Sequence, residues 1–190
     1  MNYLKSIAAI ALPLSLLASP SHADNNRGFF AGAGVSAVNV DDSPAFDKAN
    51  LWLGEVFGGY KFNPWIGGEV RYGMGLGEER LYLDEPFESA ALAAGDEVLM
   101  DIEHYSGVYY RAEAVNQTGR FYALLGYADI EFTMKGSEVS HTLSEDDFSW
   151  GLGAGFILDP HLNLNFEYRN LVDVAEYRFT TITASLDYRF

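Results

Sequence analysis

The sequence predicts an all-β protein, namely an eight-stranded antiparallel, up-and-down transmembrane β-barrel preceded by a cleaved signal peptide. Apolar and polar residues alternate through many of its segments, and this period of two is typical of strands. Tight turns and longer loops alternate between these segments, as they do in outer-membrane barrels. The last segment, 177–190, is long enough to cross a bilayer and ends on an aromatic residue. Together these observations favour a closed barrel.

The N-terminal segment has the features of a secretory signal peptide. Lys5 precedes an apolar run that is too short for a transmembrane helix, and Ser21-His22-Ala23 fits the small-x-small cleavage pattern. We therefore expect residues 1–23 to be a signal peptide and residues 24–190 to form a single barrel domain.

The composition excludes several kinds of site. The chain of 190 residues has no cysteine, which excludes a disulfide framework, a thiolate metal site and a cysteine nucleophile. Its formal net charge of −15 argues against nucleic acid as a partner. The 19 glycines suit a crowded barrel interior, and the 13 Phe, 12 Tyr and 3 Trp residues suit aromatic girdles at the membrane interfaces. No cofactor and no metal ion are expected.

The connections between segments predict which ends face the periplasm. We expect eight strands, at 28–40, 51–62, 65–76, 101–115, 120–134, 147–158, 162–172 and 177–190. Three connections are tight and combine Asn or Asp with Pro or Gly, at 63–64, 116–119 and 159–161. Four are looser, at about 41–50, 77–100, 135–146 and 173–176. The alternation predicts periplasmic turns, extracellular loops and both termini on the periplasmic side.

The direction of the apolar face distinguishes two barrel types. A lipocalin-type barrel also alternates, but it turns its apolar face inward. Here aromatic residues such as Trp52, Trp150 and Tyr168 fall near strand ends, where interface girdles lie, and the polar faces carry charges in mid-strand. We therefore expect the apolar face to contact lipid.

Charged residues on the polar faces predict an ion-pair network in the barrel lumen. An eight-stranded barrel is about wide enough for side chains to fill, and charges buried there must be paired or hydrated. The structural interpretation is a plug that holds the strands in register, and the functional interpretation is a narrow, low-conductance ion path. The size argument favours the plug. The residues assigned to the network are Glu55, Glu69, Arg71, Arg111, Glu113, Asp129, Glu131, Glu167, Arg169, Asp187 and Arg189.

Three segments resemble a family of small bacterial outer-membrane barrels, typified by the OmpA transmembrane domain, OmpX and the opacity proteins. Gly58-Gly-Tyr-Lys-Phe-Asn-Pro-Trp-Ile-Gly-Gly-Glu-Val-Arg-Tyr72 is similar to the second hairpin of that family, and Phe166-Glu-Tyr-Arg169 to its penultimate strand. The resemblance implies that the last strand closes the barrel, with Tyr188 and Phe190 forming the signal read by the assembly machinery. It also implies a location in the outer membrane and a scaffold for surface loops, with a role in envelope integrity or surface interaction.

His104 and Ser106 form the one pair that could carry catalysis. They share a face of the fourth expected strand, and a barrel enzyme that modifies lipid A places a His–Ser pair toward lipid. A nucleophile needs a base within reach and a third group to orient that base. Glu131 or Glu103 could be that group, but the family motif of the enzyme is otherwise absent. We therefore interpret the pair as an interface histidine and a tolerated serine, and expect no enzyme.

The loops at 41–50, 77–100 and 135–146 are acidic and give the remaining expected partners. A run of charged residues is most simply explained as solvated surface. The sharper hypothesis is that divalent cations bind the loop carboxylates and bridge them to lipopolysaccharide phosphates. Leu81 and Leu92 would let the second loop fold over the barrel mouth. We expect contacts with outer-membrane lipid and lipopolysaccharide, with the assembly machinery and with a surface ligand through these loops.

Overall fold

The computed structural model describes residues 27–41, 43, 48–86, 92–136, 140–174 and 177–190; the signal peptide expected at 1–23 lies outside them. Nine strands form within this part of the chain: β1 (Gly28–Asp41), β2 (Ala49–Asn63), β3 (Ile66–Gly75), β4 (Glu79–Tyr82), β5 (Glu97–Val115), β6 (Gly119–Lys135), β7 (Ser140–Ile157), β8 (Leu162–Val174) and β9 (Tyr177–Arg189). The same residues include no helix that is both long and apolar enough to span a membrane.

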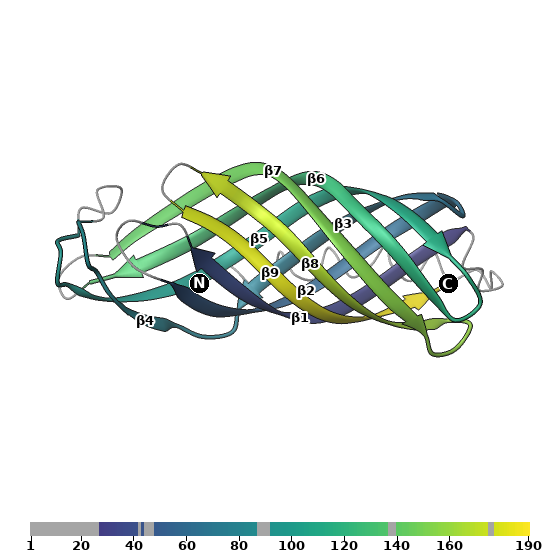
Figure 1. Cartoon of the computed structure of the whole chain (residues 1–190), viewed down its shortest axis with the longest axis horizontal. Helices are drawn as coiled ribbons and strands as arrows, with labels where there is room; N and C mark the ends of the chain where they lie inside the picture. The colour runs from purple at the N-terminus through teal and green to yellow at the C-terminus, as the bar shows by residue number, and fades with distance from the viewer. Residues whose placement is uncertain (1–26, 42, 44–47, 87–91, 137–139, 175–176) are drawn as a thin grey trace, which may run out of the picture.

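Eight of these strands close into an antiparallel barrel (Figure 1). Closure comes from β1 and β9, which pair from Phe30 opposite Arg189 to Asp41 opposite Arg178. The N–H of Phe190 extends this seam by donating to the carbonyl of Phe29 at 3.0 Å. β4 is a short additional strand that pairs with β5 beyond the end of β3. The predicted fold class is confirmed.

The apolar face of the barrel points outward. Trp52, Val56, Val108 and Leu152 each expose more than half of their surface, whereas charged residues at alternate positions of β2 and β5, such as Glu55 and Arg111, are buried. Such an outer wall is stable only against lipid, because exposed apolar patches of this extent are costly in water. The lipocalin alternative, with its apolar face inward, is therefore wrong.

The three tight turns lie at one end, beside the C-terminus (Figure 1). In each turn the first side chain accepts a backbone hydrogen bond: Asn63 from Trp65 at 2.9 Å, Asn116 from Gly119 at 2.9 Å and Asp159 from His161 at 2.7 Å. These Asx-type bonds replace the ladder bonds that a turn cannot make. The sequence predicted these turns from the same Asn and Asp residues.

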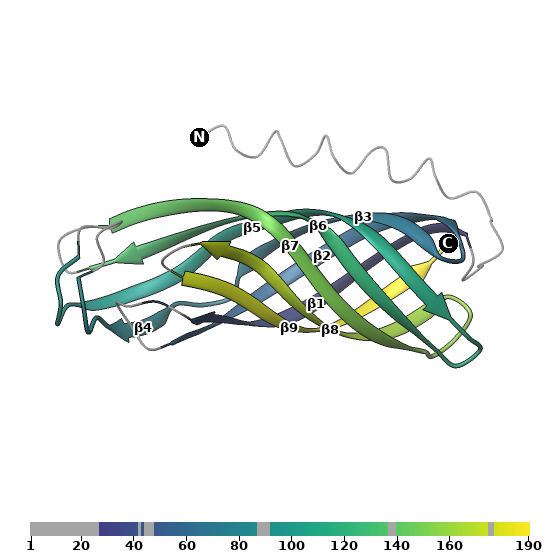
Figure 2. The same cartoon turned by 45° about the horizontal axis from the view of Figure 1, so that its top comes forward.

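The opposite end differs from the prediction because its strands are longer. β6 and β7 continue as a paired hairpin to Lys135 opposite Ser140, so most of the expected loop at 135–146 is strand. The expected loop at 77–100 contains β4 and the start of β5. Figure 2 shows this β5–β6–β7 sheet projecting beyond the ends of β8 and β9. The hydrophobic pattern missed the added part of β7 because residues 140–147 are polar at every position except Leu143.

Candidate functional site

The barrel lumen holds a buried ion-pair network centred on Arg71 of β3. Its guanidinium contacts Glu55 on β2 at 2.9 Å, Glu69 on β3 at 2.6 Å and Glu167 on β8 at 2.8 Å. Arg169 adds a second cation, with contacts to Glu55 at 2.5 Å and to Glu167 at 2.6 Å. One pair of arginines thus holds three carboxylates from three strands, so the network ties opposite walls of the barrel together.

The network continues toward the periplasmic end through Arg111. Arg111 contacts Glu69 at 2.9 Å and Glu113 at 2.9 Å, and Glu113 also accepts a hydrogen bond from Lys61 at 2.8 Å. The last members, Arg120 and Arg189, both contact Asp187. Arg120 also bonds Asn165, and Arg111 stacks 3.6 Å above the ring of Tyr122.

The structure places nine of the eleven predicted network residues in the lumen and two outside it. The nine are Glu55, Glu69, Arg71, Arg111, Glu113, Glu167, Arg169, Asp187 and Arg189, all buried. Asp129 and Glu131 point outward on β6, beside His104. Their placement in the lumen was wrong because the rule that polar residues face inward holds only within the membrane. At this height of β6 the inward residues are Ile130 and Phe132.

Two cations of the network were missed. Lys61 and Arg120 are each 1% exposed. Lys61 occupies the same strand face as Glu55, where the period of two also places it, but it was not assigned to the network. Arg120 comes directly after a turn, where the sequence alone does not show which side chains face inward. In the structure Arg120 shares the inward face of β6 with Tyr122 and Leu124. The lumen therefore contains more cations than the sequence analysis assigned to it.

Toward the extracellular end the lumen changes from charged to apolar. Twenty buried residues form one cluster there, which includes Ile102, Ile130, Phe132 and Phe179. The second loop contributes Leu81, Leu83 and Leu92 to the same cluster, so this loop folds over the mouth as the sequence suggested. Gly95 allows the chain to turn back toward β5, because its φ of 87° is one that residues with a Cβ rarely adopt. Its N–H donates to the carbonyl of Leu83 at 2.7 Å. The apolar cluster therefore lies above the ion pairs, toward the extracellular end.

β7 and β8 separate where the projecting sheet begins. Their ladder ends at Trp150 opposite Asn170, and along residues 140–149 no described strand except β6 pairs with β7. Side chains bridge the fork instead. The Asp147 carboxylate accepts hydrogen bonds from the N–H of Phe148 at 2.7 Å and of Asp173 at 3.3 Å, and Ser149 donates to the carbonyl of Asn170 at 2.6 Å. Within the described residues, the edge of β7 above this fork therefore has no strand neighbour.

The pair His104 and Ser106 lies on the outer wall near the level of Tyr72. The imidazole lies between two carboxylates, with Nε2 at 3.7 Å from Asp129 and Nδ1 at 3.6 Å from Glu131. It also stacks on the ring of Tyr72 at 6.4 Å between centroids. Among the described residues no hydrogen bond joins His104 to Ser106. The histidine therefore has acidic neighbours, but the geometry does not couple it to the serine.

The sequence of the chain matches the model of one protein family, the outer membrane protein beta-barrel domain, over residues 9–190. The chain belongs to this family. No curated protein sequence matches it. Its location in the outer membrane follows from the family and from the lipid-facing wall of the barrel.

Several solved outer-membrane barrels share this fold. Ail, the attachment invasion locus protein of Yersinia pestis, is 17% identical with a TM-score of 0.61, and the match covers 87% of this chain and 99% of Ail. Neisserial surface protein A is 14% identical with a TM-score of 0.59, covering 86% and 97%. OprG from Pseudomonas aeruginosa is 10% identical with a TM-score of 0.59, covering 90% and 99%. At these identities the likeness shows the fold alone.

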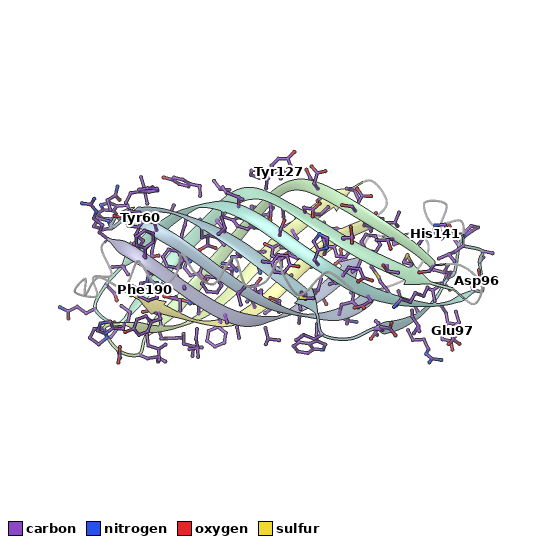
Figure 3. The ribbon with its side chains drawn as sticks, turned by 180° about the vertical axis from the view of Figure 1, so that it is seen from behind. Tyr60, Asp96, Glu97, Tyr127, His141 and Phe190 are labelled. Atoms are coloured by element: carbon purple, nitrogen blue, oxygen red, sulfur yellow. The ribbon has the colours of Figure 1, made fainter. Side chains whose placement is uncertain are left out.

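The extracellular end of this outer-membrane protein is strongly acidic. Asp96, Glu97 and His141 lie at the end opposite to Tyr60 and Phe190 (Figure 3). Lys135 is one of the few cations there; it donates to Glu78 at 2.6 Å, and this hydrogen bond raises the pKa of the lysine. Within the described residues, no three His, Asp or Glu side chains are grouped closely enough to hold a metal ion. The acidic surface is spread out rather than gathered into a cation site.

Proposed function

We propose that this protein is a sealed outer-membrane scaffold that presents an extracellular sheet and loops for contacts at the cell surface. The observation that carries the proposal is the projecting β5–β6–β7 sheet with the uncovered edge of β7. An edge strand offers unpaired backbone N–H and C=O groups, to which an extended segment of another molecule can add. Outer-membrane lipid, lipopolysaccharide and the barrel-assembly machinery are the partners that its location requires.

The chemistry of the edge suits a partner with positive charge. Glu145, Asp146 and Asp147 follow one another along the upper part of β7, with Asp129 on the neighbouring strand. A second copy in the same membrane would bring like charges together and would run its β7 in the same direction rather than antiparallel. An extended basic segment from outside the cell fits both the negative charge of these residues and the unpaired backbone N–H and C=O groups of β7.

The test shortens the hairpin by paired residues. Ala128 and Asp147 face each other across β6 and β7, so residues 129–146, which include Asp129, Glu145 and Asp146, can be replaced by an Asn-Gly turn that keeps the register. We expect cells that carry this variant to lose contact with surfaces coated with basic proteins, and to keep a heat-modifiable barrel in the outer membrane. The matched control replaces the periplasmic turn residues Gln117-Thr118 with Asn-Gly. Equal binding by both variants would contradict the proposed role.

The channel alternative has a separate test. The charged lumen supports it, whereas the apolar cluster above the ion pairs opposes it, because water and ions avoid a narrow apolar constriction. Stepwise conductance of the purified protein in planar bilayers, altered by Glu167→Gln, would replace the scaffold proposal with a channel. The enzyme alternative would require lipid A modification that Ser106→Ala abolishes, and the missing hydrogen bond between His104 and Ser106 gives it less support.

A further inference from the structure

The buried charges of the barrel lumen do not balance. Within the described part of the chain, buried cations outnumber buried anions by six to five. The cations are Lys61, Arg71, Arg111, Arg120, Arg169 and Arg189. The anions are Glu55, Glu69, Glu113, Glu167 and Asp187. A buried charge without a partner is costly, because it has lost its contact with water. The lumen therefore carries one positive charge in excess.

The excess lies at the periplasmic end of the lumen, where four cations surround the carboxylate of Glu113. Their nitrogen atoms lie 2.8 Å (Lys61), 2.9 Å (Arg111), 3.6 Å (Arg189) and 3.9 Å (Arg120) from its oxygens. Asp187, which contacts Arg120 and Arg189, is the second carboxylate of this group. The third is Glu69, which Arg111 shares with Arg71. Even with this shared carboxylate, the periplasmic group has four cations for three anions.

The same group contains N–H donors that make no hydrogen bond to any described residue. They are Nη2 of Arg111, Nη1 of Arg120, and both Nη1 and Nη2 of Arg189. Each of these three side chains belongs to a residue that is only 1% exposed. The rings of Tyr122 and Phe30 lie over Arg111 and Arg189, but a ring attracts the face of a guanidinium, whereas the N–H groups point outward in its plane. The donors and the excess charge together call for one more anionic acceptor.

We propose that the periplasmic end of the lumen binds one monovalent anion of the size of chloride, held by the N–H groups of Arg111, Arg120 and Arg189. Its single charge matches the single excess charge of the lumen. Its small size suits arginines that are almost fully buried, because a larger anion needs the packed side chains around them to move apart. Entry is from the periplasm, because the apolar cluster lies on the extracellular side of the ion pairs. This site is independent of the surface role proposed above, because it lies inside the barrel and not on the edge of β7.

Urea-induced unfolding in lipid vesicles at a series of chloride concentrations tests the site. Gluconate, which is too large for the buried site, replaces chloride so that the ionic strength stays constant. An anion that binds only the folded barrel stabilises it with the logarithm of its concentration once the dissociation constant is exceeded. We expect each tenfold increase in chloride to raise the ratio of folded to unfolded protein by up to about tenfold. An unchanged urea midpoint across the series would show that water satisfies these N–H groups, and would overturn the proposal.

Matched variants, each of which replaces one cation by glutamine, locate the site. Arg120→Gln removes one of the unbonded N–H donors and balances the charge of the lumen, so the dependence on chloride should be lost. Lys135→Gln removes the same charge at the exposed hairpin tip and should keep the dependence. An equal dependence in Arg120→Gln and in the unaltered protein would place the ion elsewhere and contradict the proposal. If Arg120→Gln fails to fold, Lys61→Gln also balances the charge and leaves Glu113 to the arginines, and it too should lose the dependence.

Discussion

At the scale of single residues, Arg71 is the side chain on which most of the lumen network depends. It is the shared partner of Glu55, Glu69 and Glu167, each of which is nearly inaccessible to water. A buried ion pair contributes little compared with an apolar replacement of both partners, but removing one partner leaves an uncompensated buried charge. Removing Arg71 should therefore cost more stability than removing any one of its three carboxylate partners.

The substitution Arg71→Met should lower the free energy of unfolding by about 3–5 kcal/mol. Urea-induced unfolding in lipid vesicles, followed by tryptophan fluorescence, measures the change. The exposed pair at the hairpin tip provides the control, because Lys135→Gln removes an ion pair with Glu78 that is screened by water and should leave the midpoint unchanged. If Arg71→Met and Lys135→Gln unfold at the same urea concentration, the network does not stabilise the barrel.

The packing of the lumen also depends on glycines, which leave space for large neighbouring side chains. A Cβ added to Gly153 on β7 would lie 2.2 Å from the ring carbon Cζ of Tyr122, and that ring is held by Arg111. Gly153→Ala should therefore destabilise the barrel by about 1–3 kcal/mol through overpacking. Gly58→Ala on the lipid face has room and serves as the control. Unfolding midpoints of the two variants decide the point, and a tolerated Gly153→Ala would show that Tyr122 can move.

At the scale of elements, the fork between β7 and β8 is the place where side chains replace a ladder. Asp147→Ala removes the acceptor of both Phe148 N–H and Asp173 N–H. We expect amide hydrogen exchange to speed up in β8 above Asn170 and to stay slow below it, where the ladder to Trp150 is intact. Asp146→Ala, on the opposite face of β7, is the control. Faster exchange along the whole of β8 would mean that the fork is not a local unit.

The elements also show what the sequence could predict. The membrane strands, the turns at Asn63, Asn116 and Asp159, and the inward faces of Glu55, Arg71 and Arg169 follow from period two and turn chemistry. The extension of β7 from residue 147 back to Ser140 does not, because outside the bilayer both faces of a strand can be polar. Asp129 and Glu131 were assigned to the wrong face because at this end of β6 the inner face is apolar, with Ile130 and Phe132, and the polar residues point outward. The fork depends on pairing between distant strands, which a single sequence does not display.

At the scale of the whole molecule, the lumen has two seals in series. The lower seal is the ion-pair network and the upper seal is the apolar cluster that includes Phe132 and Phe179. Paired charges fill the lower lumen, and an apolar constriction above them excludes water as long as its side chains remain. We therefore expect that weakening one seal leaves the other closed, whereas a pore gated by ion pairs alone would open.

Planar-bilayer recordings of four proteins test this arrangement. The unaltered protein and the variant Glu167→Gln/Arg169→Gln should show no stepwise conductance, because the apolar cluster is intact in both. Phe132→Ser/Phe179→Ser should also stay closed, because the ion pairs still fill the lumen below. Only the variant that combines all four substitutions should conduct, provided that its heat-modifiability shows a folded barrel. Conductance from Glu167→Gln/Arg169→Gln alone would show that the upper seal opens on its own, and the sealed scaffold would then have to be replaced by a gated channel.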